Sequence, residues 1–498
     1  MLDELARALR RDPGRPAVLA ATAFGGLTVR ATRGELADRA DGYAAALHRR
    51  GLVAGDTLGI AVRPGPRSLA VLLGAYRLGL RVAVLDPTAG PDVLLARLAL
   101  ARPALVVADA AAQAVAGWAR PLAHRAHLAL PDLTRLGPVV TVGRRLPGCA
   151  PTLAAGPGGV PRPDVDGDRD AVVVFTSGTT SQPRAVVHTR ASLSAGMRTV
   201  ADLVDPRAGE PVLGGTFFVL IPSLTRGAPV VLPARTGRGV ARQLNRLRPQ
   251  ATYLTPPQLR AALAAGARFT GRVWSGSAPV SAELLRRVRA SGAAEAWGVY
   301  ALTEMFPAAA VEAAEKAAFT GDGDLVGSLL PGVRSRLDST GQLLLSGPGA
   351  ADRYLDGPRL RWVATGDLAT VDSGGATGGR VVLAGRCKDM ILRRADNIYP
   401  GLYEPALHIP GVNLAVLVGV PAGDGDERLV AVVEPEPGVD RRRLRAALET
   451  PLTGMGAARP DAVVFAAVPL SGRSRKPDRP AAARLAATAT AAPHGGRP

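Results

Sequence analysis

Lysine is nearly absent from this chain of 498 residues. Only Lys316, Lys388 and Lys476 occur among its 61 lysine and arginine residues, so arginine carries almost all of the positive charge. Arginine offers a planar fork of donors, whereas lysine offers a compact point charge on a flexible stem. A lysine kept in the arginine-rich segment SGRSRKPDRP, residues 471–480, therefore raises the hypothesis of chemistry that a guanidinium cannot do, with chance as the alternative.

Cysteine and histidine are also scarce. The two cysteines, Cys149 and Cys387, lie far apart and lack metal-ligand spacing, which argues against a disulfide framework and fits a reducing compartment. The six histidines do not cluster, which argues against a zinc site or a histidine base. Residues 1–16 are polar and helix-like rather than a signal peptide, and no apolar run reaches the ~18 residues of a membrane span. We therefore expect a cytoplasmic protein that does not bind a membrane.

Aromatic residues make up only 4% of the chain, although its net charge is +19. The arginines are scattered and accompany heavy use of alanine, glycine and proline, which indicates a compositional bias rather than a nucleic-acid surface. A nucleic-acid-binding protein would instead show DNA binding with a steep dependence on salt concentration. A hydrophobic content of 47% with 21% charged residues is typical of a globular protein.

Hydrophobic periodicity predicts strands that alternate with helices. Residues 27–49 read as a strand followed by a helix, and residues 57–87 read as strand, helix and strand. This alternation predicts an α/β fold in which helices cover a parallel sheet. A smaller unit begins after Arg386, with strand-like runs at NLAVLVGV and RLVAVVEPE, and we expect the last 13 residues to be frayed.

The segment VVVFTSGTTSQPRAVVHT, residues 172–189, runs from a buried strand straight into a loop rich in hydroxyls. Such a loop presents backbone N–H groups and side-chain oxygens to one point, which suits a polyphosphate, and Arg184 adds a cation. The Walker A pattern is absent. A serine- and threonine-rich surface turn is the alternative for this segment alone.

Three further motifs follow in order before the lysine segment: WGVYALTEM, ATGDLATVDSGG and LAGRCKDMILRRADNIYPGLYE. Together the set resembles the adenylate-forming superfamily of acyl-CoA synthetases, peptide-synthetase adenylation domains and luciferases. The resemblance implies a large multi-layer αβ domain over residues 1–385, a hinge at 386–388, and a small mobile α+β domain over 389–498. It also implies that ATP and Mg²⁺ are used to activate a carboxylic acid as an acyl adenylate, with release of pyrophosphate.

The resemblance also implies roles for individual residues. Lys388 would be the hinge residue, and Lys476 would bridge the substrate carboxylate and the α-phosphate. Thr303 would bond the α-phosphate, and Glu304 would help to hold Mg²⁺, which favours oxygen ligands. The positions assigned to the rest of ATP are Thr176, Ser177, Gly178, Thr179, Thr180 and Arg184 at the β- and γ-phosphates, Gly276, Ser277, Ala278 and Tyr300 at the adenine, and Asp367 and Arg386 at the ribose.

Several positions depart from the family pattern. Ser181, Arg184 and Ala185 replace glycine, lysine and glycine in the phosphate loop, Ala301 replaces a glycine, and Ala395 replaces a glycine beside the pantetheine tunnel. A methyl group at position 395 can obstruct close approach of a ligand. The acyl-pocket segment PLxH is missing from residues 212–229, and Lys476 stands one residue later than is usual.

These departures put ligation to coenzyme A in doubt more than adenylation itself. Residues 62–90 are similar to the branch that contains β-lactone synthetases, in which the substrate's own hydroxyl displaces AMP. Another outcome without a thioester is ATP-dependent diazotisation of an aryl amine with nitrite, and either would suit specialised biosynthesis. A catalytically dead nucleotide-binding homologue is a further alternative, which pyrophosphate exchange would distinguish. The substrate itself cannot be named from residues 212–229.

Overall fold

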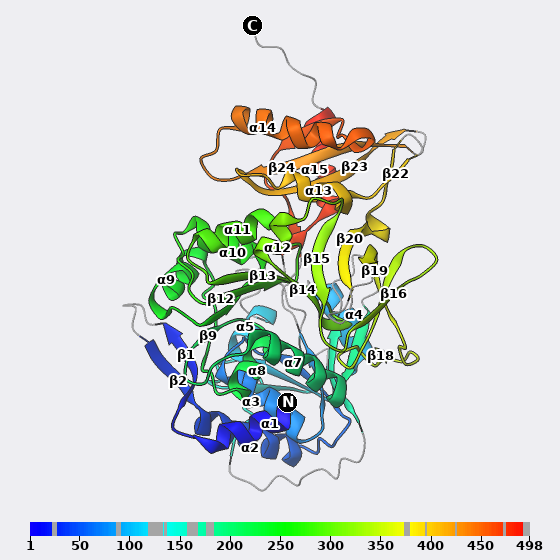
Figure 1. The fold of residues 1–498 in the computed structure, drawn as a ribbon. Helices are drawn as coiled ribbons and strands as arrows, with labels where there is room; N and C mark the ends of the chain where they lie inside the picture. The colour runs from blue at the N-terminus through cyan, green and yellow to red at the C-terminus, as the bar shows by residue number, and fades with distance from the viewer. Residues whose placement is uncertain are drawn as a thin grey trace.

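Two large sheets dominate the first 386 residues of the computed structural model (Figure 1). The structure describes residues 1–21, 27–85, 91–117, 133, 137–156, 168–175, 184–372, 379–393, 396–423, 426–471 and 475–491. The expected α/β class is therefore confirmed, with large N-terminal sheets and a small C-terminal sheet.

The smaller of the two N-terminal sheets has seven strands within the described ranges, in the order β18-β8-β7-β4-β3-β5-β6. The five strands from β7 to β6 pair in parallel, as the alternation of strands and helices predicted, whereas β8 and β18 add an antiparallel edge on the other side. The bounds are β3 (Thr57–Ala61), β4 (Arg81–Val84), β5 (Leu105–Asp109), β6 (Val139–Val142), β7 (Asp170–Phe175), β8 (Ala185–Thr189) and β18 (Arg353–Tyr354).

The larger sheet has thirteen strands among the described residues and changes character at β13. The strands from β1 to β13 through β10, β9, β11 and β12 pair in parallel, but from β13 onwards the pairing is antiparallel, so this sheet is mixed rather than parallel. In sheet order the bounds are β16 (Arg334–Leu337), β17 (Gln342–Ser346), β19 (Val363–Asp372), β20 (Arg380–Arg386), β15 (Asp324–Leu329), β14 (Met305–Glu312), β13 (Glu295–Leu302), β12 (Arg272–Gly276), β11 (Ala251–Tyr253), β9 (Val212–Leu213), β10 (Val230–Val231), β1 (Pro16–Ala21) and β2 (Leu27–Thr32).

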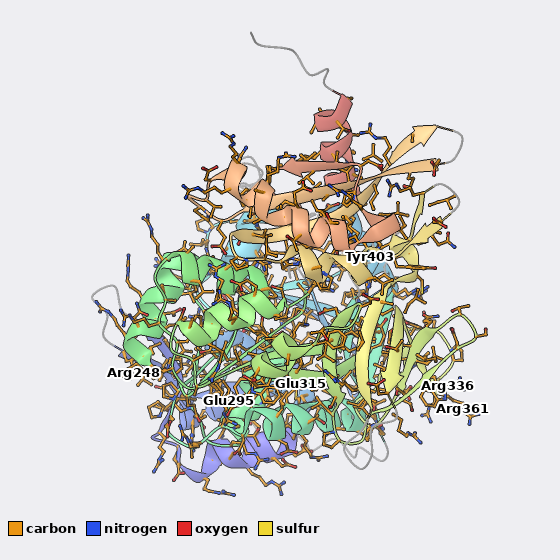
Figure 2. All side chains as sticks on the ribbon, turned by 45° about the horizontal axis from the view of Figure 1, so that its top comes forward. Arg248, Glu295, Glu315, Arg336, Arg361 and Tyr403 are labelled. Atoms are coloured by element: carbon orange, nitrogen blue, oxygen red, sulfur yellow. The ribbon has the colours of Figure 1, made fainter. Side chains whose placement is uncertain are left out.

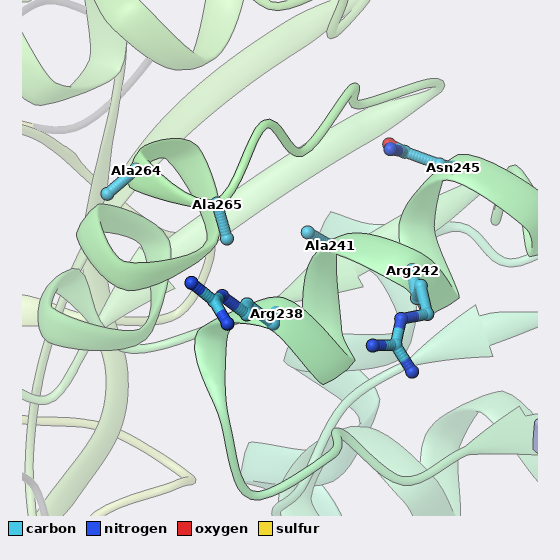
Figure 3. Close-up of a pocket in the computed structure, with 6 residues that line it drawn as sticks. All are labelled: Arg238, Ala241, Arg242, Asn245, Ala264 and Ala265. Carbon is cyan, nitrogen blue, oxygen red and sulfur yellow. The ribbon is translucent and has the colours of Figure 1, made fainter. Parts of the chain in front are cut away.

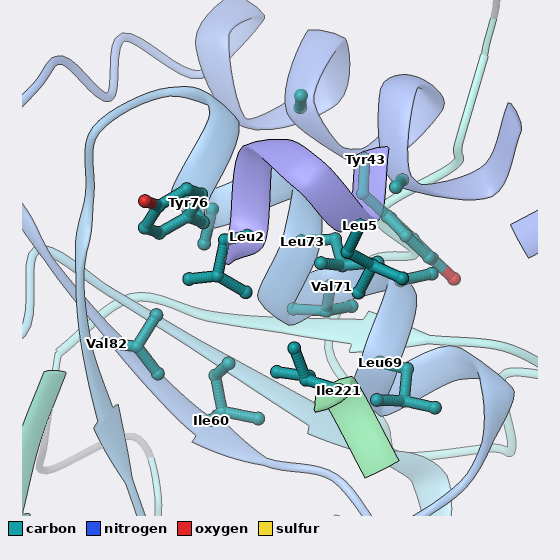
Figure 4. Packing of buried hydrophobic residues seen from close by; sticks show 14 of the residues in the cluster. Leu2, Leu5, Tyr43, Ile60, Leu69, Val71, Leu73, Tyr76, Val82 and Ile221 are labelled. Atoms are coloured by element: carbon teal, nitrogen blue, oxygen red, sulfur yellow. The ribbon is translucent and has the colours of Figure 1, made fainter. Parts of the chain in front are cut away.

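Helices cover these sheets because each helix buries an apolar stripe. Leu2 and Leu5 of α1, Tyr43 of α2 and Leu69 of α3 meet Ile221 of α8 in one core (Figure 4). The N-terminal helices are α1 (Leu2–Arg11), α2 (Arg33–Arg49), α3 (Pro66–Arg77), α4 (Pro91–Ala101), α5 (Ala110–Ala116), α7 (Arg190–Val204), α8 (Phe217–Thr225), α9 (Gly237–Leu247), α10 (Pro256–Ala264), α11 (Ala282–Ala290) and α12 (Ala313–Ala318).

The C-terminal part, orange to red in Figure 1, is built on the sheet β23-β24-β25. One face packs against Leu444 and Leu448 of α14, and the other against Ala482 and Ala486 of α15. Residues up to 491 are thus helical, where a frayed end was expected. The bounds are η2 (Cys387–Asp389), β21 (Ile391–Arg393), β22 (Asp396–Ile398), α13 (Pro400–Leu407), β23 (Val412–Gly423), β24 (Asp426–Pro435), α14 (Arg441–Gly454), η3 (Gly456–Ala458), β25 (Ala462–Phe465), β26 (Leu470–Ser471), β27 (Lys476–Pro477) and α15 (Arg479–Ala491).

The two C-terminal cores contain no described residue from before Ile391. This separation agrees with a small second unit, although the boundaries at 385 and 389 and the mobility of the unit stay predictions.

No described helix has the length and apolarity needed to span a membrane. Charged side chains are spread over the surface, with Arg248 and Arg336 at opposite edges of the view in Figure 2.

Candidate active site

The first element of the site is the turn between β13 and β14, which consists of Thr303 and Glu304. The two strands form an antiparallel hairpin in which Leu302 pairs with Met305, so these two residues occupy its tip. Nε2 of the buried His188 lies 2.8 Å from the Thr303 carbonyl, and the Ala351 N–H donates to the Glu304 carbonyl at 2.8 Å. The turn is therefore held on both sides by strands or loops from elsewhere in the chain.

The environment of His188 favours its neutral form. Burial lowers the pKa of this imidazole, and only the bond to the Thr303 carbonyl acts in the opposite direction. A neutral imidazole has one N–H, and that donor is needed at Nε2 to bond a carbonyl. His188 thus ties β8, which follows the phosphate-loop motif, to the Thr303 turn.

The side chain of Glu304 lies beside Tyr354, which no motif had indicated. The Tyr354 hydroxyl donates to Glu304 Oε1 at 3.0 Å, and the Arg184 guanidinium lies 5.5 Å from the centre of the Tyr354 ring. Burial and then the Glu304 charge raise the pKa of Tyr354. Tyr354 is on β18, which pairs with β8 immediately after Arg184. The pairing therefore brings two predicted site residues, Arg184 and Glu304, around one tyrosine.

A second cluster forms around Asp367 on β19, which is only 5% exposed. The Tyr300 hydroxyl donates to Asp367 Oδ2 at 2.6 Å, and Arg386 Nε donates to Oδ1 at 2.8 Å. Asp367 and Arg386 are direct partners in the β19–β20 ladder, and Tyr300 comes from β13. Burial, followed by the Asp367 charge, raises the pKa of Tyr300 well above its usual value. Three residues assigned to the nucleotide are thus in mutual contact.

Lys476 reaches this region from the C-terminal part. It is an exposed residue of β27, and its ammonium lies close enough to Arg386, Asp367, Lys388 and Glu304 for their charges to act on it. The surrounding protein, and then Arg386, lower the pKa of the ammonium, while the two carboxylates partly offset this. The last predicted residue therefore joins the group formed by strands of the large sheet.

The small residues at the end of β12 have a structural reason of their own. Gly276 pairs with Val299, and a Cβ atom at position 276 would stand 2.8 Å from the Val299 carbonyl oxygen. Ser277 follows in a left-handed conformation, with φ of 70°, and its hydroxyl lies 3.0 Å from the Tyr253 hydroxyl. Close approach of two strands thus demands glycine here, and the adenine contacts of Gly276, Ser277 and Ala278 stay predictions.

For some predicted positions the proposed role stays untested. Residues 176–180, Ser181 and Ala395 lie outside the described residues. Lys388 is exposed on the short helix η2, and its role as a hinge stays a prediction. In the described part of the chain, no three histidine, cysteine or acidic side chains gather as a metal site, so Glu304 stands without a second predicted protein ligand.

A surface cavity of about 400 Å³ lies between α9 and α10 (Figure 3), and none of its lining residues is a predicted site residue. It is lined by Arg238, Ala241, Arg242, Asn245, Ala264 and Ala265. The chemistry-bearing residues instead gather where β13, β19 and β20 meet the C-terminal hairpin.

Known proteins match most of this chain in sequence and fold. The family model described as AMP-binding enzyme matches residues 5–355. An olefin β-lactone synthetase of Stenotrophomonas maltophilia is 27% identical over 461 aligned residues, which cover 80% of each chain. A feruloyl-CoA synthase of an Amycolatopsis species is 29% identical over 324 residues, which cover 58% of this chain and 64% of that one.

Among solved structures, the amide bond synthetase McbA from Marinactinospora thermotolerans has the same fold, with a TM-score of 0.76. The two sequences are 23% identical, and the match covers 97% of this chain and 99% of that chain. ATP-bound MatB from Rhodopseudomonas palustris matches with a TM-score of 0.75 and 22% identity, over 98% of this chain and 99% of that chain. The chain thus belongs to the AMP-binding enzyme family and is an ATP-dependent, adenylate-forming enzyme of the kind that activates acids.

Proposed function

We propose that this enzyme joins a carboxylic acid to AMP, with ATP as co-substrate and Mg²⁺ as cofactor, and that the substrate's own hydroxyl then displaces AMP. The observation that carries the first step is the meeting of Lys476 with Glu304, Asp367 and Arg386. A cation from the C-terminal part stands there beside carboxylates and a guanidinium from the large sheet. Such an arrangement can stabilise charge that develops between two anionic reactants.

Asp367, Tyr300 and Arg386 form the nucleoside end of the proposed site. An ionised carboxylate offers about four acceptor positions, and the bonds from Tyr300 and Arg386 use two of them. Asp367 can therefore accept further bonds from the ribose hydroxyls without losing either partner. Those two bonds also fix the orientation of the carboxylate, which lowers the entropic cost of binding the sugar.

Thr303, Arg184 and Glu304 form the phosphate end. The Thr303 hydroxyl would donate to the α-phosphate, and Arg184 would pair with the β- and γ-phosphates together with the loop at residues 176–180. Magnesium in proteins is commonly bound by one or two carboxylates plus substrate phosphates, so a single Glu304 carboxylate fits this ion. When bound, the ion would neutralise charge on the phosphate oxygens. The Tyr354 hydroxyl bonds Oε1 of this carboxylate and so helps to fix its orientation.

Lys476 would act at the point where bonds change. A carboxylate oxygen of the acid attacks the α-phosphorus, the bond to the β-phosphate oxygen breaks, and pyrophosphate leaves with the electron pair. The Lys476 ammonium would lie between the attacking carboxylate and the α-phosphate oxygens, where its three donors serve both groups. Burial and the charges of Arg386 and Lys388 lower the pKa of this ammonium, while Asp367 and Glu304 act in the opposite direction.

The second step distinguishes two candidate functions. Ring closure is supported by the olefin β-lactone synthetase, because the likeness to that relative extends over 80% of both chains and therefore beyond the AMP-binding match. In ring closure the substrate hydroxyl attacks the acyl carbon, the bond to AMP breaks, and the hydroxyl proton passes to solvent. Transfer to coenzyme A is the second candidate. It is supported by the likeness to the feruloyl-CoA synthase, which covers a shorter part of this chain.

The test is a pyrophosphate-release assay on a panel of acids, with and without coenzyme A, followed by product mass. A 3-hydroxy acid should release pyrophosphate at a rate indifferent to coenzyme A and give a product lighter by one water. Thioester formed at the rate of pyrophosphate release would overturn ring closure and establish a CoA ligase. A parallel reaction with nitrite and an aryl amine tests diazotisation, and no pyrophosphate release from any substrate would contradict adenylation altogether.

A further inference from the structure

Arg479, three residues after Lys476, makes more polar contacts than its position at the start of a helix requires. Its Nη1 and Nη2 donate to the two carboxylate oxygens of Glu404 at 2.7 and 2.8 Å, a paired arrangement. Its Nε donates to Asp389 Oδ2 at 3.0 Å, and Nη1 also donates to the Leu417 carbonyl at 2.8 Å. All three charged side chains are largely buried, with exposures of 24% or less.

These bonds connect three separate elements to the segment that carries Lys476. Asp389 closes η2 directly after Lys388, Glu404 belongs to α13, and Leu417 belongs to β23. Glu404 also accepts from the Leu417 N–H at 2.7 Å, so its carboxylate is itself fixed. Burial disfavours the charge on Arg479, but Glu404 and Asp389 outweigh burial and raise the pKa of the guanidinium. Arg479 therefore stays charged.

Among the described residues, the strand that presents Lys476 is held by few other backbone contacts. Strands β26 and β27 pair over two residues each, and Ser471 is the partner of Lys476. The Asp478 N–H donates to the Pro469 carbonyl at 2.8 Å, and the Asp478 side chain caps α15 by accepting from Ala481 N–H at 2.9 Å. A two-residue ladder is marginal by itself, so the nearest charge-assisted contacts set the position of the strand.

We propose that Arg479 is a positioning residue, which fixes the Lys476 strand to the η2 turn and α13 so that the ammonium reaches the site of adenylate formation. The inference rests on the proposed role of Lys476. The planar guanidinium donates to Asp389 and to both oxygens of Glu404 at once, whereas the donors of an ammonium all lie on a single nitrogen. Lysine at position 479 would therefore keep the charge and lose part of the anchoring.

The kinetic test compares Arg479→Lys, Arg479→Gln and Asp389→Asn with Arg484→Gln, an exposed arginine on the same helix α15. ATP–pyrophosphate exchange should fall by about 10²-fold in kcat for Arg479→Gln, because small displacements of a reacting group cost that much. The KM for ATP should stay within about twofold, since the nucleotide contacts lie on the large sheets. Arg479→Lys should recover part of the rate, and Arg484→Gln should match the wild type.

A second measurement reports on Lys476 without any substrate. Reductive methylation with ¹³C-formaldehyde labels only the three lysines and the N-terminal amine, and Lys476→Arg identifies the Lys476 signal. We expect this signal to move in Arg479→Gln and Asp389→Asn, because the ammonium leaves its charged surroundings. The Lys316 signal should stay in place in every variant, since that amine is buried and paired with Asp324 on β15.

The two measurements together decide the proposal. An unmoved Lys476 signal in Asp389→Asn and Arg479→Gln overturns it. If the rate of ATP–pyrophosphate exchange is also lost while the signal stays unmoved, Arg479 serves folding alone. If Arg479→Gln does not fold, Asp389→Asn decides, because the paired Glu404 contact remains in that variant. Failure of the wild type to adenylate any acid contradicts the proposed function and leaves the Lys476 signal as an independent test.

Discussion

At the scale of single residues, the three lysines have three different surroundings. Lys316 is buried, and its ammonium donates to Asp324 and to the Leu325 carbonyl, so it has a structural role. Lys388 and Lys476 are exposed, and the charges of Lys388, Asp367 and Arg386 all act on the Lys476 ammonium. An ammonium with a lowered pKa gives up its proton more readily than an ordinary lysine, so the charge at Lys476 depends on the neighbours that surround it.

Replacement of Lys476 should affect catalysis far more than folding. We expect Lys476→Ala to lose about 10²–10³-fold in adenylate formation, comparable to the loss of one preorganised donor to developing charge. Lys476→Arg should recover little of this, because a planar fork places its donors at different angles. ATP–pyrophosphate exchange and the melting temperature measure the two effects. Near-normal exchange in the arginine variant would contradict the geometric argument.

Asp367 and Glu304 should separate nucleotide affinity from metal requirement. Asp367→Ala removes the acceptor shared by Tyr300 and Arg386, so ATP affinity should fall by about tenfold or more. Glu304→Gln should instead raise the Mg²⁺ concentration that gives half-maximal exchange, because a neutral amide binds this ion poorly. Calorimetric ATP binding and a Mg²⁺ titration check the two results. A large fall in melting temperature with unchanged ligand affinity would assign both carboxylates to structure.

At the scale of elements, local patterns predicted the strands and helices but not their long-range partners. The alternating runs at residues 27–49 and 57–87 form β2, α2, β3, α3 and β4 as expected. The antiparallel half of the larger sheet could not be predicted in this way, because a period of two identifies a strand without naming its neighbour. The motif WGVYALTEM indicated a nucleotide site, yet it gave no sign that Thr303 and Glu304 form a hairpin tip.

The same limit applies to the contacts that hold the site. His188 reaches Thr303 across 115 positions of sequence, and Tyr354 reaches Glu304 across 50. His188 lies within the segment 172–189 but was assigned no role, and Tyr354 lies in no motif. Each acquires its place only when β8, β14 and β18 assemble. The grouping of Asp367 with Arg386 was predicted through the family resemblance, and the ladder between β19 and β20 supplies its physical reason.

His188 should make the stability of the turn sensitive to acid. Burial holds its folded-state pKa below the unfolded value, so acid protonates the unfolded chain first, and stability is lost as the pH falls below about 6.5. The fall in melting temperature between pH 7.5 and pH 5.5 should therefore be smaller in His188→Gln than in the wild type. The exposed His48→Gln serves as the matched control. An identical pH dependence in all three proteins would contradict the argument.

At the scale of the whole molecule, charged residues join the C-terminal part to the large sheets. Arg287 of α11 forms an ion pair with Glu436, which follows β24, and both side chains are about three-quarters buried. Arg260 of α10 lies near Glu434, and burial lowers the pKa of its guanidinium to about 10, with Glu434 acting in the opposite direction. A polar contact of this kind is typical of surfaces that separate and meet again, unlike a hydrophobic core.

Reversing one charge at this contact should disfavour the arrangement that brings Lys476 to the site. Arg287→Glu places two carboxylates together, so adenylation should fall by several-fold, the scale of about 1 kcal/mol for a partly exposed pair. The double variant Arg287→Glu with Glu436→Arg should restore most of the rate. Exchange assays at low and high salt measure both effects. Equal rates in the single and double variants would show that this pair does not support the arrangement.

The position of Lys476 along the chain also has a consequence for how the enzyme is made. Synthesis proceeds from the N-terminus, and the large sheets with Arg184, Glu304 and Asp367 precede Lys476, which follows Arg386 by 90 positions. Domains that emerge early fold early, so the nucleotide-binding strands can assemble while the ribosome is still reading the rest of the message. With Lys476 in its proposed role, such a nascent chain would hold ATP without activating an acid. The reactive anhydride would then be withheld until the hairpin that carries Lys476 has been translated and folded.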